Sequence, residues 1–335
     1  MKLSLKVLLY LDYDEQSGLG HISRSRAIIE TLSSFTNKIY ISSKMNPLDV
    51  EPQIGFLNEV KWISYEEAEL IHFDLVYVDT YIFEIISKVE HLNIERKILL
   101  IDSNYTQKLP SWPDMIIDLE QITPRNCNFR GTYLFGDILV HSELEFTKQT
   151  RKNHGVRKSV PSNLTVVVNF GGSIKIETYL RQLGLTFLNN REIHYIIYSP
   201  HSLIERLKKY FQNYKNVEIK RFSPNYLNDL AMCDFLVTNS GTSFIEGLYI
   251  DVPMVVFNLF PNAELNFEKL RYSRQVIYSG LTNELESSWQ SDVLKSFQSR
   301  SKSSNFKSND DLKIEILGGG IIKSALNGLG LTELP

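Results

Sequence analysis

The sequence contains few cysteines, and this excludes two classes of protein. Cys127 and Cys233 are the two cysteines among 335 residues, and they stand far apart. Two distant cysteines provide neither a disulfide framework nor a CxxC metal site. The cysteine content therefore favours a reducing compartment, and we expect a cytoplasmic protein.

Long apolar runs and an excess of one charge are also missing. Runs such as Val252–Leu259 are far shorter than the roughly 18 residues that span a bilayer. The apolar stretch 5–11 is short and runs into Asp12, so it indicates a first β-strand and not a signal sequence. Lys and Arg number 36 against 39 Asp and Glu. Without a net basic field, neither nucleic acid nor an anionic membrane is expected as the main partner.

What the sequence does have is an alternation of short β-prone runs with helical patterns. In the first half, strands are predicted at Lys6–Leu11, Lys38–Ser42, Val60–Ile63, Leu75–Val78, Lys97–Asp102 and Met115–Asp118. In the second half, they are predicted at Leu164–Phe170, Ile193–Tyr198, Val217–Arg221, Phe235–Thr238 and Met254–Phe257. Helices are predicted at Ile22–Leu32, Ile82–His91, Ile176–Asn189, Ser202–Tyr214, Ser243–Tyr249, Glu264–Tyr272 and Gly318–Leu329. This order predicts an α/β protein with two doubly wound, Rossmann-like domains that face each other across a cleft.

The boundary between the two domains is expected within residues 148–163. This stretch lacks apolar periodicity and carries six basic positions, with His154 counted, which favours a solvated linker over a basic binding site. The N-terminal domain is therefore assigned to residues 1–155 and the C-terminal domain to residues 161–335. A second polar stretch, Gln298–Asp311, predicts a mobile loop.

The first candidate site is the start of the first helix, because open parallel sheets bind ligands beyond the carboxyl ends of their strands. Gly18 and Gly20 let the backbone approach a ligand, and the helix N-terminus attracts an anion. His21 lies in the first helical turn, where the positive end of the helix dipole favours a neutral imidazole. A neutral imidazole accepts a proton, so His21 is predicted to be a general base. The alternative is a capping or packing histidine.

The second candidate site follows the strand Phe235–Thr238. Ser240, Gly241 and Thr242 offer backbone N–H groups and hydroxyls at a helix N-terminus, which is typical of a diphosphate site. Glu246 lies one turn further, where a carboxylate accepts two hydrogen bonds from a ribose diol. The alternative is an ordinary N-cap with Glu246 as its capping-box partner.

The third candidate site is the first strand–helix turn of the second half. Gly171, Gly172 and Ser173 are the counterpart of the Gly18 turn and are predicted to bind phosphate; the alternative is a tight turn that needs a positive φ. Asp12 and Asp14 resemble a DxD metal motif, but a loop with two solvated acids is favoured. His72, like most of the other histidines, has only surface or core context.

These motifs resemble those of the metal-independent UDP-sugar hydrolases of pseudaminic acid biosynthesis and of the wider glycosyltransferase-B (GT-B) superfamily, which includes the peptidoglycan N-acetylglucosaminyltransferase. The resemblance covers nearly the whole chain. The matching residues are Gly18, Gly20, His21 and Arg24 of a Gly-x-Gly-His-x-x-Arg motif, Asp79 and Tyr81, Phe170–Ser173, Ser240–Thr242 with Glu246, and the late pair Asn262 and Asn266. Departures include Ser103 and Ala263, where the family has Asp and Gln.

The resemblance implies a UDP-sugar held mostly by the second half, with its anomeric carbon presented to the first half. His21 would activate a water that displaces UDP with inversion, and Tyr81 would position the sugar or the water. Asp79, Asn262 and Asn266 would lie on the sugar side. The products would be UDP and a free amino- or deoxy-sugar for a nonulosonic acid or surface-glycan pathway. No metal and no cofactor is implied, and the helix Gly318–Leu329 would dock onto the first half.

Two other functions remain open at this point. An inverting glycosyltransferase of the same fold would use His21 to deprotonate an acceptor hydroxyl in place of water. A non-catalytic homologue would bind the nucleotide alone. The residues do not name the sugar, the acceptor or the oligomeric state.

Overall fold

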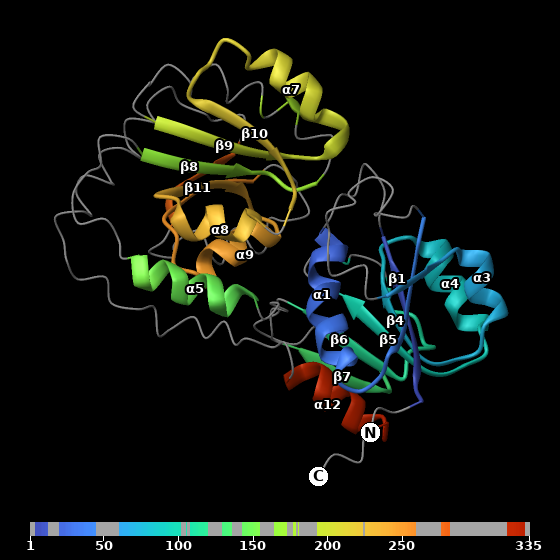
Figure 1. The fold of residues 1–335 in the computed structure, drawn as a ribbon. Helices are drawn as coiled ribbons and strands as arrows, with labels where there is room; N and C mark the ends of the chain where they lie inside the picture. Colours follow the sequence, from blue (N-terminus) through green and yellow to red (C-terminus); the bar gives the residue numbers. More distant parts are fainter. Residues whose placement is uncertain are drawn as a thin grey trace. The chain divides into compact units, whose positions relative to one another are not determined.

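The protein is described from a computed structural model. It covers residues 4–12, 20–44, 60–101, 105, 108–119, 129–135, 143–154, 164–172, 177–178, 180, 193–223, 225–258, 276–281 and 320–331. The chain divides into two compact units (Figure 1). Unit 1 comprises Met1–Asp49, Gly55–Ser142 and Ile314–Pro335, and unit 2 contains Glu143–Lys313. Each unit holds one parallel sheet with helices, which confirms the predicted α/β class.

Unit 1 is built on a seven-stranded parallel sheet of order β3-β2-β1-β4-β5-β6-β7. Its strands are β1 (Lys6–Leu11), β2 (Lys38–Ser43), β3 (Lys61–Ile63), β4 (Phe73–Asp79), β5 (Ile94–Ile101), β6 (Met115–Asp118) and β7 (Thr132–Phe135). Its helices are α1 (Gly20–Ser33), α3 (Tyr65–Leu70), α4 (Phe83–His91) and α12 (Gly320–Gly328).

The central strands of unit 1 are apolar along most of their length because both faces of the sheet are covered. On one face, Leu8 and Tyr10 of β1 join a core cluster with Ile85, Ile86 and Val89 of α4. Neighbouring residues of a strand point to opposite faces, so the residues between them point toward α1. In Figure 1, α3 and α4 lie on one side of this sheet, and α1 and α12 lie on the other.

Unit 2 is built on a six-stranded parallel sheet of order β10-β9-β8-β11-β12-β13. Its strands are β8 (Leu164–Asn169), β9 (Ile193–Ser199), β10 (Val217–Arg221), β11 (Phe235–Asn239), β12 (Met254–Asn258) and β13 (Val276–Leu281). Its helices are α5 (Glu143–His154), the 3-10 turn η2 (His201–Leu203), α7 (Ile204–Tyr210), α8 (Asn225–Met232) and α9 (Thr242–Tyr249). Val166, Val168 and Val237 of the sheet pack with Leu207 of α7 in one core cluster.

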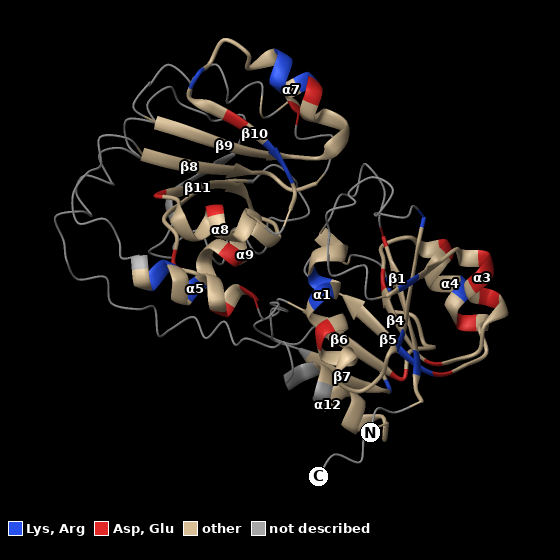
Figure 2. Ribbon diagram, in the orientation of Figure 1, with Lys and Arg blue, Asp and Glu red and all other residues tan. Residues whose placement is uncertain are grey.

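The outer helix faces carry charges of both signs. Charges of both signs alternate on α4 and α7, and α3 carries Glu residues beside Lys88 of α4 (Figure 2). Lys88 of α4 pairs with Glu69 of α3 at 3.7 Å, and Lys208 pairs with Glu205 within α7 at 3.2 Å. Exposed pairs of this kind contribute little to stability, so these faces are solvated surfaces.

The boundary between the units differs from the expected one at 148–163. Residues 148–154 are not a linker but the end of α5, which belongs to unit 2. Arg151 anchors this helix by donating to the carbonyl oxygens of Ala231, Cys233 and Asp251 at 3.2, 2.8 and 3.3 Å. These bonds occupy the guanidinium with backbone acceptors, so Arg151 serves a structural contact in place of a basic binding site.

The C-terminal helix belongs to unit 1, although residues 161–335 were assigned to one C-terminal domain. The predicted helix Gly318–Leu329 is present as α12, and α12 contacts α1 and β7 of unit 1. Ile322, Ala325 and Leu326 are fully buried in this contact region. The last helix of the chain therefore completes the core of the first unit.

Some predicted elements lie outside the described residues, and some described elements were not predicted. The helix Glu264–Tyr272, most of the helix Ile176–Asn189 and the loop Gln298–Asp311 fall outside. Five described elements were not predicted from the sequence, namely α3, α5, α8, β7 and β13. Within the described part of the chain, no helix is both long and apolar enough to cross a membrane.

Candidate functional site

Each sheet has one point at which its strand order reverses. In unit 1, β1 pairs with β2 on one side and with β4 on the other. In unit 2, β8 pairs in the same way with β9 and β11. Doubly wound sheets bind ligands beyond the carboxyl ends of the strands at this point. We define the unit 1 site as Asp12, His21, Arg24, Asp79 and Tyr81, and the unit 2 site as Asn169, Gly171, Asn239, Gly241 and Glu246.

The carboxylate of Asp79 is the centre of the unit 1 site. Asp79 ends β4, and it is 1% exposed. Arg24 donates to it twice, from Nε to Oδ2 at 2.8 Å and from Nη2 to Oδ1 at 2.6 Å. His21 Nδ1 lies 2.8 Å from Oδ1. Burial alone would raise the pKa of Asp79, but the charges of and hydrogen bonds from Arg24 and His21 outweigh it and lower the pKa to about 2.

The position of the His21 ring follows from the helix and from the carboxylate. His21 and Arg24 are three residues apart in α1, so both side chains lie on the same helix face. A proton on Nδ1 would donate to the Asp79 carboxylate at 2.8 Å, whereas a bare Nδ1 would accept from Arg24 Nη2 at 2.9 Å. In the first of these two tautomers, Nε2 is the proton acceptor.

Asp12 fixes the turn that follows β4. Its two oxygens accept hydrogen bonds from the Thr80 hydroxyl and from the Tyr81 N–H, the second at 2.6 Å. The Tyr81 ring stands edge-on to the His21 ring, with centroids 4.9 Å apart. Burial raises the pKa of Asp12 above its usual range, against the lowering effects of His21 and of these hydrogen bonds. Asp12 is thus buried, and the expectation of a solvated loop acid at this position is wrong.

The unit 2 site contains two asparagines that make the same local hydrogen bond. Asn169 ends β8, and its Oδ1 accepts the N–H of Gly171 at 2.9 Å. Asn239 ends β11, and its Oδ1 accepts the N–H of Gly241 at 3.2 Å. Their amide groups also donate, Asn169 to the Ser243 hydroxyl at 2.8 Å and Asn239 to a backbone carbonyl at 3.0 Å. These bonds hold both strand–helix turns in fixed shapes.

Helix α9 begins in this site without a capping side chain from its N-cap residue. The N-cap is Gly241, so neither Ser240 nor Thr242 fills that position, and the predicted alternative of a Ser or Thr cap with a Glu246 capping box is wrong. Glu246 is 7% exposed. Burial, followed by the charge of Glu246, raises the pKa of Tyr226 well above its usual range.

The structure covers most of the predicted site residues. His21, Asp79 and Tyr81 come together in unit 1, and Gly20 begins α1 beside them. Gly171, Gly172, Ser240, Gly241, Thr242 and Glu246 lie in the turns and helix of unit 2. Gly171 has a φ of 88°, as the tight-turn alternative requires. Gly18, Ser173, Asn262 and Asn266 lie outside the described residues, as does Asp14.

Sequence reasoning missed the roles of four residues. Arg24 appeared only as part of a motif, although it binds Asp79. Asp12 was expected to be a solvated acid, although it directly follows an apolar strand. Asn169 and Asn239 were not singled out, although each stands two residues before a glycine at a strand end. This repeated Asn-x-Gly spacing was the available signal, because an asparagine commonly accepts the N–H two residues on.

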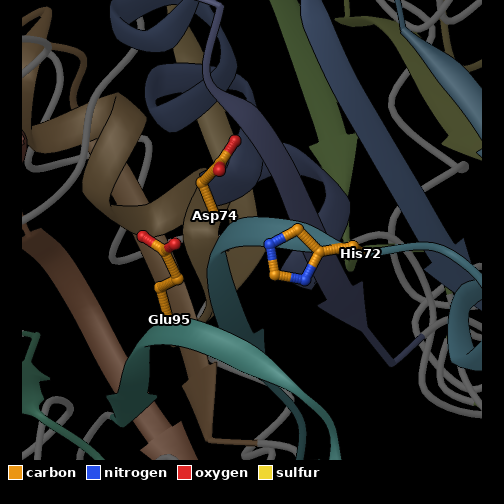
Figure 3. A group of neighbouring side chains, drawn as sticks. All are labelled: His72, Asp74 and Glu95. Carbon is orange, nitrogen blue, oxygen red and sulfur yellow. The ribbon is translucent and has the colours of Figure 1, made fainter.

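One group of described side chains has the composition of a metal site. His72, Asp74 and Glu95 offer ligand atoms that all lie within 4.8 Å of one another (Figure 3). Asp74 already accepts the Lys6 N–H at 2.6 Å, and the other two side chains are exposed. The group lies at the amino ends of β4 and β5, whereas Asp79 lies at the carboxyl end of β4. It is therefore separate from the unit 1 site.

Comparison with known proteins supports the fold. No protein-family model and no curated protein sequence matches the chain. Among solved structures, HepE of Anabaena with UDP and glucose is 10% identical, with a TM-score of 0.53 over 98% of this chain and 100% of that one. MurG of Acinetobacter baumannii is 10% identical, with a TM-score of 0.51 over 87% and 90%. UGT89C1 of Arabidopsis thaliana, complexed with UDP-L-rhamnose, is 12% identical, with a TM-score of 0.57 over 96% and 98%. At these identities the likeness concerns the fold alone, and the chain has the GT-B fold.

Proposed function

We propose that this chain is an enzyme that acts on a UDP-sugar and transfers the sugar to an acceptor hydroxyl. The observation that carries the proposal is the buried contact of His21 with Asp79 at the strand-order reversal of unit 1. An imidazole held by an ionised carboxylate is the usual arrangement of a general base and its orienting group. The structural neighbours solved with UDP and glucose or with UDP-L-rhamnose support a UDP-sugar as the donor.

Unit 2 is the proposed nucleotide-binding unit. The N-terminus of α9 presents the positive end of the helix dipole, which suits a diphosphate. Glu246 lies one turn further in the same helix and is proposed to accept the ribose hydroxyls. Asn169 and Asn239 accept the N–H groups of Gly171 and Gly241 and so fix the shape of both turns before the ligand arrives, which lowers the entropy cost of binding.

Unit 1 supplies the proposed chemistry. Nε2 of His21 takes the proton of the acceptor hydroxyl, and the acceptor oxygen attacks the anomeric carbon. The bond from that carbon to the UDP oxygen breaks, and its electron pair leaves with UDP, so the configuration inverts. Asp79 stays ionised and stabilises the imidazolium that forms. Tyr81, edge-on to the ring, is proposed to position the sugar or the acceptor.

Hydrolysis of the UDP-sugar is the second candidate. It is favoured by the motif Gly18-x-Gly20-His21-x-x-Arg24, which resembles that of the pseudaminic acid pathway hydrolases. In the structure, Arg24 and His21 of this motif share one carboxylate. Water would then replace the acceptor hydroxyl, and the same base would activate it.

One assay separates these candidates. The protein is incubated with UDP-glucose or another UDP-sugar, with and without a panel of hydroxyl acceptors, and UDP and free sugar are measured. Transfer that requires an acceptor supports the transferase, whereas free sugar released at enzymatic rates without an acceptor supports the hydrolase. UDP binding with neither reaction over a broad panel of UDP-sugars would contradict both and leave the non-catalytic homologue. The His21→Asn variant is the control for background hydrolysis.

A further inference from the structure

Arg24 makes a contact that a simple His–Asp pair does not need. Its Nη2 lies 2.6 Å from Asp79 Oδ1, and the same nitrogen lies 2.9 Å from His21 Nδ1. The guanidinium of Arg24 therefore contacts both the imidazole of His21 and the carboxylate that orients it. The Arg24 side chain is 12% exposed, so water screens these charges weakly.

The charges around the imidazole oppose one another. Asp79 favours the protonated ring, and Arg24 disfavours it at nearly the same distance. The other described groups that face His21 are the carboxylate of Asp12, which is buried after β1, and the Tyr81 ring after β4. Without Arg24, the ring would face two carboxylates and no cation among the described residues.

We propose that Arg24 is a positioning residue that keeps His21 neutral and therefore able to accept a proton. The positive charge of Arg24 compensates the negative charge of the ionised Asp79. That carboxylate can then orient Nδ1 without holding the ring as an imidazolium before the reaction begins. By donating to both Asp79 oxygens, it also fixes the plane of the carboxylate that His21 uses. The inference rests on the proposed function for its catalytic meaning, but the charge state of His21 is measurable in the free protein.

The first test follows the imidazole by NMR. Histidine labelled with nitrogen-15 is incorporated, and the His21 signals are assigned from their loss in His21→Asn. In the wild type we expect the neutral ring to carry its proton on Nδ1. In Arg24→Gln, which removes the charge and keeps a donor, the titration midpoint of the ring should lie above that of the wild type. In Arg24→Lys, which keeps the charge, it should stay near the wild-type midpoint.

The second test uses the pH dependence of kcat/KM with a UDP-sugar. In Arg24→Gln, the acid limb should move to higher pH, and activity at a fixed pH on that limb should fall about tenfold for every tenfold drop in the neutral fraction of His21. On the alkaline plateau, activity should recover to within about threefold of the wild type. A residue with only a structural role would lower activity equally at every pH. Arg26→Gln, which breaks the Arg26–Glu30 pair in the same helix, is the matched control and should leave the profile in place.

The outcomes separate this inference from the proposed function. An unchanged or lower midpoint in Arg24→Gln overturns the inference, whether or not the protein turns over a UDP-sugar. A raised midpoint without activity in the wild type supports the charge balance and rejects the proposed function. If Arg24→Gln does not fold, the inference requires that Arg24→Lys folds and keeps both the midpoint and the Nδ1–H tautomer. Loss of either in that variant would contradict it.

Discussion

The two sites occupy equivalent places in their sheets, but the side chains at their strand ends differ in charge. Each site is built where the two strands at the order reversal end, on the last residue of a strand or, for Asp12, on the residue directly after it. In unit 1, these positions hold buried carboxylates with a guanidinium and an imidazole. In unit 2, the same positions hold neutral asparagines whose hydrogen bonds go to backbone groups and to a hydroxyl. The same topology thus supports ionised side chains at the strand ends of one unit and neutral amides at the strand ends of the other.

The charge at each strand end indicates which role that position suits. Carboxylates at the end of β1 and β4 would repel a diphosphate, but they orient and polarise a proton-accepting ring. Neutral amides at the end of β8 and β11 add no negative charge, so the positive end of α9 remains available to an anion. The comparison predicts that variants in unit 1 change turnover and that variants in unit 2 change nucleotide affinity.

The largest expected effect is at His21. His21→Asn keeps a polar side chain but cannot accept a proton, so turnover should fall about 10²–10⁴-fold. UDP affinity, measured by calorimetry, should stay within about twofold, because that function is proposed for unit 2. His72→Asn, at the amino end of β4, is the control and should leave both quantities unchanged. A His21→Asn variant with more than about a tenth of wild-type turnover would remove the general-base role.

The next effect concerns the ionised pair in unit 1. The pKa of Asp79 is lowered to about 2, so its charge stabilises the fold above about pH 4, and this contribution is lost as the pH falls toward 2. The contribution is about 2 kcal/mol by linkage. Urea unfolding of the wild type and of Asp79→Asn should therefore differ most near neutral pH. The difference should shrink as the pH falls through 4 to 2. A constant difference over that range would show that Asp79 is not ionised by its partners.

A smaller effect is expected at Glu246 in unit 2. Glu246→Gln keeps the shape but weakens a charge-assisted contact to the ribose, worth about 1.5–3 kcal/mol. UDP affinity should fall at least tenfold by calorimetry, in contrast to every variant of the unit 1 site. Glu205→Gln on α7, where the side chain is 88% exposed, should not change it. Unchanged UDP binding in Glu246→Gln would exclude Glu246 from the nucleotide site and weaken the comparison between the units.

The smallest effect tests whether the unit 2 turn is shaped by its backbone. Gly171 has a φ of 88°, which side chains rarely adopt, so Gly171→Ala should lower the free energy of unfolding by about 1 kcal/mol. Gly20→Ala is the counterpart in unit 1, where an added Cβ meets no atom within 4 Å. That variant should be neutral or slightly stabilising in urea unfolding. Equal costs at the two glycines would contradict this account.

Much of the sheet architecture was predictable from the sequence because buried parallel strands read as continuous apolar runs. β1, β6 and β10 have the predicted bounds. The four-residue edge strand β7 was missed because so short a run carries little periodicity. The polar helix α5 was predicted in part as a linker. Its contacts depend on Leu144, Thr147 and Arg151, which recur at helical spacing but are not an apolar stripe.

The site was predictable in part for a similar reason. The sequence alone shows a histidine after two glycines at a predicted helix start and an acid at the end of a predicted strand. The pairing of Arg24 with Asp79, which are 55 residues apart, depends on β4 lying next to β1. Strand order is a property of the whole fold, so local patterns did not show that these charges meet. The burial of Asp12 could not be predicted from the sequence either, because its partners Thr80 and Tyr81 follow the neighbouring strand β4.

The position of α12 has a consequence for how the chain is assembled. The chain leaves unit 1 after Ser142 and returns to it at Ile314, so unit 2 is in connectivity an insertion with both ends tethered. During synthesis, unit 1 is begun before unit 2, but α12 is made only after all of 143–313. Unit 2 can therefore fold before unit 1 has received α12. A fragment that starts at residue 161 would lack all of α5 and carry α12 without α1 and β7, whereas a fragment spanning 143–313 has neither defect.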